Sequence, residues 1–191
     1  MLIAWQSGRA RRTVFPMLAF LKFVGLLNSA IWLGALLFAS FVVLPVFFSP
    51  EVTPALMHRY YSGRIAEIVL RRLVWLQLVC GGIALLHYFG EWLYAGKPLP
   101  RFAAGSVVAM LLLVSIGGFW LQPQMERWHL VKYASNTPPV QRADAVKKFS
   151  RWHGVSQVIN LLVVAGVIVH FVRHANMPAA TKFSRGGRGA N

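Results

Sequence analysis

Four long stretches without a charged residue restrict what this chain can fold into more than any other feature. They cover residues 23–50, 73–90, 102–125 and 152–172. A helix needs about 20 predominantly apolar residues to cross roughly 30 Å of hydrocarbon, and each stretch approaches or exceeds that length. We therefore predict an all-α fold, an integral membrane four-helix bundle, with spans at about residues 18–48, 70–94, 102–124 and 152–174.

The composition favours a surface covered by lipid. Only 13% of the 191 residues are charged, and the mean hydropathy is +0.54, whereas about a quarter of the residues of a soluble domain are charged. The 20 lysines and arginines against five acids give a formal charge of +15. Because these charges lie in loops and tails, they indicate contact with the anionic headgroups of a lipid bilayer, and we expect no nucleic acid partner.

The chain divides into three parts. We expect residues 1–17 to form a basic N-terminal segment, residues 18–175 the four-span transmembrane domain, and residues 176–191 a flexible basic tail. Pro45 and Pro123 are expected to close the first and third spans, because proline lacks the N–H group that continues a helix.

Two loop segments are expected to form short amphipathic helices in the membrane interface. The first, residues 49–72, is rich in aromatic residues and leads into the second span. In the second, residues 140–149, apolar residues recur at every third position after a helix start predicted at Thr137, which precedes two prolines.

A weak internal repeat links the two halves of the domain. The first and third spans each carry small and aromatic residues ahead of a proline, and the second and fourth end in GGIALLHYF and AGVIVHFV. Two helical hairpins repeated in the same orientation would be related by an approximate twofold axis along the membrane normal. A chance likeness among apolar helices is the alternative.

The distribution of lysines and arginines does not fix the orientation. With four spans, ten lie on each side of the membrane, although cytoplasmic loops usually carry more of them. We expect the termini to lie in the cytoplasm, because the charges around the first span often determine the orientation of the whole protein.

Four side-chain amides interrupt the apolar spans: Asn28, Gln77, Gln157 and Asn160. An amide in hydrocarbon needs a partner, and hydrogen bonds between membrane helices average about 0.6 kcal/mol. We expect Gln157 and Asn160 to face the bundle interior, with Asn28 and Gln77 as candidate partners. The alternative is that the four amides line a polar cavity for a small solute or a proton.

Histidines offer a cofactor hypothesis. His87 and His170 lie near the same membrane face, on the second and fourth spans, at equivalent places in the repeat. Two imidazoles across a four-helix bundle can hold b-type haem, and such a pair also binds copper. The simpler interpretation is a pair of histidines at the headgroup level with no cofactor. On the other face, His58, His129 and His153 are candidates for a surface metal site.

The sequence carries no catalytic motif. Glu67 lies between Arg64 and Arg71 at spacings that suit salt bridges on one helix. We find no Gly-rich phosphate loop, no serine with a suitable histidine and acid, and no paired carboxylates. We therefore expect no enzymatic activity.

Two segments resemble a known family. WLGALLFASFVVLPVFF, residues 32–48, and FSRWHGVSQVINLL, residues 149–162, are similar to the transmembrane protein 205-like family, whose bacterial members carry domain of unknown function 4149. The matching positions are Trp32, Gly34, Pro45, Phe47, Pro123, Phe149, His153, Gly154 and Asn160. The first-span pattern also resembles copper resistance protein D, although the first span here has no histidine.

The resemblance covers about residues 18–173 and implies a four-helix membrane protein, for a bacterial member in the inner membrane. His153 would anchor the fourth helix at the headgroups, and Gly154 would permit close approach of another helix. Eukaryotic members are associated with drug and metal tolerance.

Three functions suit these features. We favour a non-enzymatic structural or accessory subunit of a membrane complex, which packs with itself or with other subunits. The alternatives are a haem- or copper-binding membrane protein that uses His87 and His170, and a small transporter or metal and drug tolerance factor.

Overall fold

The computed structural model describes the backbone of residues 4–56, 59–95, 98 and 100–176, and the side chains of these residues from residue 20 on, except residue 95. Its elements are α1 (Ala4–Phe38), the π-helical segment η1 (Ala39–Val43), α2 (Leu44–Val46), α3 (Val52–Ala55), α4 (Arg59–Ala95), α5 (Arg101–Ser115), the π-helical segment η2 (Ile116–Leu121), α6 (Gln122–Tyr133) and α7 (Pro139–Ala175).

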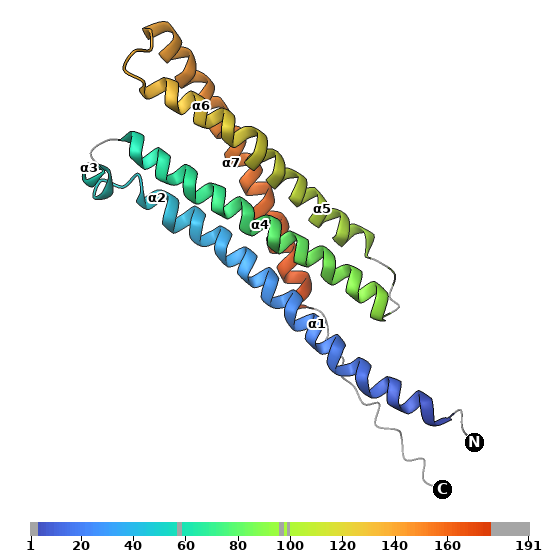
Figure 1. The fold of residues 1–191 in the computed structure, drawn as a ribbon. Helices are drawn as coiled ribbons and strands as arrows, with labels where there is room; N and C mark the ends of the chain where they lie inside the picture. Colours follow the sequence, from blue (N-terminus) through green and yellow to red (C-terminus); the bar gives the residue numbers. More distant parts are fainter. Residues whose placement is uncertain (1–3, 57–58, 96–97, 99, 177–191) are drawn as a thin grey trace.

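Four helical rods lie side by side and antiparallel (Figure 1). They are α1 with η1 and α2, then α4, then α5 with η2 and α6, and finally α7. Both α1 and α5 pack against α4 and α7, so the rods enclose one core. Each rod is long and apolar enough to cross a membrane. The structure confirms the prediction of an all-α membrane helical bundle.

The two ends of the bundle differ. α1 begins and α7 ends at one end, which we call the terminal end, and α3 and the turn between α6 and α7 lie at the opposite end (Figure 1). α4 and α7 contain 37 residues each, or about 55 Å of helix, against roughly 30 Å of hydrocarbon. Both helices therefore extend well beyond the apolar layer.

The amphipathic segments expected to form separate surface helices are mostly continuous with the spans. α4 begins at Arg59, and α3 is the separate short helix. α7 begins at Pro139, two residues after the helix start predicted at Thr137. No proline interrupts residues 59–72 or 140–152. The helix therefore continues from the amphipathic turns into the apolar ones without a break.

Each predicted closing proline follows a π-helical segment. In η1 and η2 the backbone hydrogen bonds shift to a five-residue spacing, with Leu44 N–H donating to the Ala39 carbonyl and Gln122 N–H donating to the Gly117 carbonyl. The wider turn accommodates the proline ring just after it. The first rod ends at Val46, but the helix does not end at Pro123. It continues to Tyr133, so that expectation was wrong.

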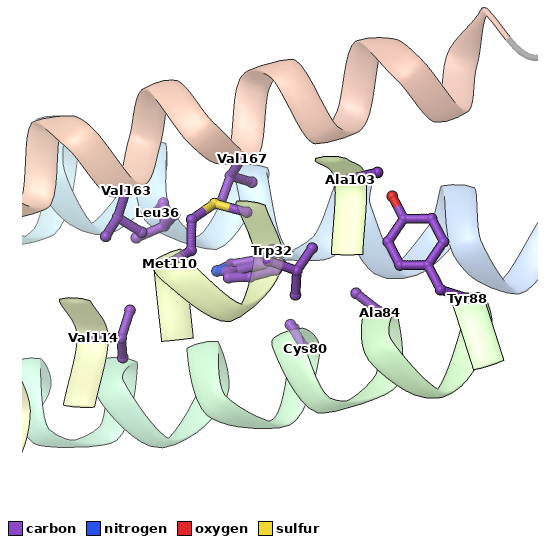
Figure 2. Close-up of a cluster of buried hydrophobic side chains, with 11 residues drawn as sticks. Trp32, Leu36, Cys80, Ala84, Tyr88, Ala103, Met110, Val114, Val163 and Val167 are labelled. Atoms are coloured by element: carbon purple, nitrogen blue, oxygen red, sulfur yellow. The ribbon is translucent and has the colours of Figure 1, made fainter. Parts of the chain in front are cut away.

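The core is small and built around Trp32. Fully buried Trp32 lies in the middle of a cluster that includes Met110 of α5 and Val167 of α7, with Cys80 and Ala84 of α4 facing it (Figure 2). Large apolar side chains cover the outside, such as Phe41 and Phe102, which are 74% and 79% exposed. An apolar exterior around a small core suits lipid as the surrounding solvent.

Some glycines allow close helix contacts and others do not. A Cβ on Gly81 would lie 2.4 Å from the Leu111 side chain, and one on Gly166 would lie 2.6 Å from Met110 Sδ. A Cβ on Gly154 would meet nothing within 4 Å. The expectation that Gly154 permits a close approach is therefore wrong. The signature glycine Gly34 likewise has open space around it.

Candidate functional site

Five buried polar side chains gather near the terminal end of the bundle. We call them the histidine cluster; its members are His87, Tyr88 and Glu91 of α4 and His170 and His174 of α7. Each is at most 8% exposed. Ionisable residues inside a membrane bundle are rare and usually functional, so this cluster is the candidate site.

The spacing along each helix brings the cluster together. His87 and Glu91 are four residues apart on α4, and His170 and His174 are four apart on α7, so each pair occupies one helix face. α1 closes the third side at Gly25. A Cβ there would lie 2.9 Å from the His87 ring and 3.0 Å from His174 Cδ2, so only glycine lets the α1 backbone reach both rings.

The members of the histidine cluster differ in the number of hydrogen bonds that they make. The Tyr88 hydroxyl lies 3.2 Å from His170 Nδ1, and His174 Nδ1 lies 3.0 Å from the His170 carbonyl oxygen. A carbonyl only accepts, so His174 Nδ1 carries a proton. His87 has no hydrogen-bond partner for either ring nitrogen, and its Nε2 lies 3.9 Å from Glu91 Oε1. His87 is therefore the least satisfied member.

The three imidazoles are close enough to interact electrostatically. The ring centroids of His170 and His174 are 4.4 Å apart, and those of His87 and His174 are 5.3 Å apart. Trp32 meets His170 edge to face at 6.2 Å, which connects the cluster to the core. Among the side chains that the structure describes, the charged ones at this end are Lys22 on α1, Glu91 on α4, Arg101 on α5 and Arg173 on α7. Glu91 alone among the five acids lies here.

The cluster as placed does not fit haem or copper. The His174 ring lies within contact distance of both His87 and His170, so the imidazoles pack on one another and leave no slot for a macrocycle. Among the described residues no group of three His, Cys, Asp or Glu side chains is arranged to hold a metal ion. In this geometry the chemistry available to the cluster is the binding and sharing of protons.

The sequence predicts only part of this cluster. Counting along the spans places His87 and His170 at the same membrane face, and the structure puts both in one cluster, joined by His174. His174 and Glu91 are members that the sequence pattern did not single out. The spacing of four residues from His170 and from His87 was the available indication.

The four amides do not meet one another as expected. Asn28 Nδ2 donates to the Cys80 carbonyl at 2.9 Å across the α1–α4 contact, and Asn160 Nδ2 lies 3.2 Å from Ser40 Oγ in η1. Gln77 is buried, and its Oε1 has no hydrogen-bond partner. Gln157 is exposed and contacts His153 on its own helix at 3.3 Å. The prediction that Gln157 faces the interior is therefore wrong.

A second polar group joins α4 to α6 at the opposite end. Arg64 pairs with Glu67 at 2.7 Å, as its spacing predicted, and also with Glu126. Arg71 pairs with Glu126 at 3.2 Å, on the neighbouring helix. His129 Nδ1 lies 3.4 Å from Glu67 Oε1. These ion pairs join α4 to α6 where the two helices extend past the apolar core.

The candidates for a surface metal site are not brought together as a metal site. His129 is buried and stacks on Tyr60, with ring centroids 5.4 Å apart. His153 is exposed and stacks on Phe149 at 5.8 Å. His58 lies outside the described residues. The signature residues Phe149 and His153 thus form an aromatic pair on the surface of α7.

Comparison with known proteins gives one match. The family model described as "Domain of unknown function (DUF4149)" matches residues 27–134, which include α4, α5 and most of the Trp32 core. Neither the curated proteins nor the solved structures contain a match to this chain. The match covers more than half of the chain, and the protein therefore belongs to the family defined by domain of unknown function 4149.

Proposed function

We propose that this membrane protein is a non-enzymatic accessory subunit whose histidine cluster binds protons and thereby controls the contact between α4 and α7. One observation carries the proposal. His87 is buried with both ring nitrogens unpartnered, beside two further imidazoles and one carboxylate. Buried polar groups are normally hydrogen-bonded, so an exception calls for an explanation such as a role in proton binding.

The charges around the cluster favour one bound proton over two. Glu91 can balance the first imidazolium. A second imidazolium would place two positive charges about 5.3 Å apart, on His87 and His174. At an effective dielectric constant of about 20, their repulsion is about 3 kcal/mol. Arg173 and Lys22 add positive charge at this end. A second proton should therefore push α7 away from α4.

Spin labels can measure this movement. Leu86 on α4 and Val169 on α7 are exposed and can carry labels after Cys80→Ala, L86C and V169C substitutions. Between pH 8 and pH 5, we expect the distance between the labels to increase by about 1–2 Å, the size of a small helix shift. The protein should be studied in lipid nanodiscs.

Two variants decide the origin of the movement. His87→Gln removes a titrating group and should abolish the change, whereas His153→Gln removes an exposed histidine on the same protein and should leave it intact. The proposal fails if the distance does not change with pH, or if His87→Gln responds like the parent protein.

The proposal also includes a partner subunit and a location in the cell. The resemblance to the transmembrane protein 205-like family supports a location in the bacterial inner membrane and a role in drug or metal tolerance. The proposed cytoplasmic location of the termini is based on the charges around the first span. The lipid-facing aromatic surface supports association with other subunits or with a second copy, because van der Waals packing drives helix association in lipid. Co-purification in mild detergent would identify such a subunit.

A further inference from the structure

A groove on the outside of the bundle lies between α4 and the η2–α6 rod, near the opposite end. Its volume is about 290 Å³, and its walls come from Arg71, Val74 and Trp75 on one side and Gly118, Phe119, Gln122 and Pro123 on the other. Small-molecule sites usually measure about 300–1,000 Å³. The groove is thus large enough for part of an elongated ligand.

Two features of the sequence create the groove. Gly118 has no side chain, and its backbone lies so close to α4 that a Cβ would be 2.5 Å from Val74 Cγ1. The aromatic rings of Trp75 and Phe119 meet edge to face at 5.8 Å and are 55% and 56% exposed. The missing side chain at Gly118 leaves the groove hollow. The rings of Trp75 and Phe119 form its apolar walls, which face the surrounding lipid.

The groove runs from the polar boundary of the membrane into the apolar layer. The uncharged stretch of α4 begins at Leu73, and that of the third rod ends at residue 125. Arg71 therefore lies where headgroups are expected, and Trp75 lies about 6 Å deeper, at 1.5 Å of rise per residue. A phospholipid has the same order of parts, with a phosphate above acyl chains.

The polar end of the groove carries positive charge. The Arg71 side chain is 61% exposed, and one of its nitrogens pairs with Glu126 at 3.2 Å. A guanidinium has five N–H donors, so donors remain for a phosphate, which arginine binds in a two-pronged geometry. Ten lysines and arginines against four acids lie on this side of the membrane, an excess that attracts anionic lipid.

We infer that this groove is a binding site for one anionic phospholipid. The lipid phosphate contacts Arg71, and an acyl chain lies against Val74, Trp75, Phe119 and Pro123. Because the site is on the outer face and away from the histidine cluster, the inference does not depend on the proton-binding function.

Quenching of Trp75 fluorescence by brominated acyl chains tests the site. The protein is placed in phosphatidylcholine vesicles that contain increasing fractions of brominated phosphatidylglycerol or brominated phosphatidylcholine. The Trp75 signal is the difference between the wild type and Trp75→Phe. We expect half-maximal quenching at an about fivefold lower fraction of the anionic lipid, the effect of one favourable arginine contact.

Neighbouring arginines provide a matched pair of variants. Arg71→Ala should abolish the preference for the anionic lipid, and Arg72→Ala, an exposed neighbour that does not line the groove, should retain it. Equal quenching by both lipids in the wild type would overturn the inference, as would an equal loss in both variants. Protection of Trp75 from both lipids would show that a second copy or another subunit covers the groove, and would also overturn it.

Discussion

Replacing Trp32 by alanine is expected to destabilise the bundle by about 3–5 kcal/mol, the usual cost of removing a buried large aromatic side chain. Trp32 is 0% exposed and lies at the centre of the core (Figure 2). In lipid the loss comes mainly from van der Waals contacts, because acyl chains are as apolar as the core. The free energy of unfolding by denaturing detergent would measure the loss.

An exposed tryptophan is the control for this substitution. Trp92 is 47% exposed, so Trp92→Ala should change the free energy of unfolding by less than about 1 kcal/mol. Trp32→Ala also removes the ring that meets His170 at 6.2 Å, so the histidine cluster should loosen together with the core. Equal losses in the two variants would contradict the placement of Trp32 at the centre of the core.

Replacing Gly118 by alanine should destabilise the bundle by about 1–3 kcal/mol, the range for overpacking. The new methyl group would lie 2.5 Å from Val74 Cγ1 and 3.3 Å from its Cβ. Valine is branched at Cβ and has few alternative rotamers, so the helices must separate. Thermal unfolding in mild detergent would detect the change.

A substitution at a second glycine is expected to change the stability in the opposite direction and serves as the control. A Cβ on Gly105 of α5 would meet nothing within 4 Å. Gly105→Ala should therefore stabilise the protein by up to about 1 kcal/mol, because alanine favours helix more than glycine does. If both substitutions change the stability in the same direction, the close contact between η2 and α4 is not as described.

The sequence predicted the four spans well because hydrocarbon tolerates so few alternatives. Chain segments in lipid must satisfy their own backbone groups, and a charge-free stretch of sufficient length is then a helix. The helix ends were less predictable. The sequence predicts a helix end at Pro123, but the π-helical turn before this residue accommodates the proline ring. Such a turn depends on packing between helices, which the sequence does not display.

The sequence predicts how deep each residue of the candidate site lies along its helix, but not which way its side chain faces. The positions of His87 and His170 near one membrane face follow from counting residues along the spans. Whether their side chains turn toward each other depends on how each helix is rotated about its axis, which neighbouring helices decide. For that reason His174 and Glu91 were missed, although each lies one helical turn from a histidine that was found.

Gln157 is a residue that was expected to face the bundle interior but is turned outward by the rotation of its helix. α7 buries a narrow seam that includes Val163, Val167, His170 and His174, with the alternating three- and four-residue spacing of a packed helix. Asn160 lies on this seam, seven residues before Val167. Gln157 is one residue past the seam position at 156, which is enough to turn its side chain outward.

Titration of the histidine rings by ¹⁵N nuclear magnetic resonance, with the protein in lipid nanodiscs, tests the central claim most directly. We expect His87, His170 and His174 to respond together to pH, and His87→Gln to alter the curves of the other two. Independent curves for the three rings, with those of His170 and His174 unaffected by His87→Gln, would contradict the buried proton-binding cluster.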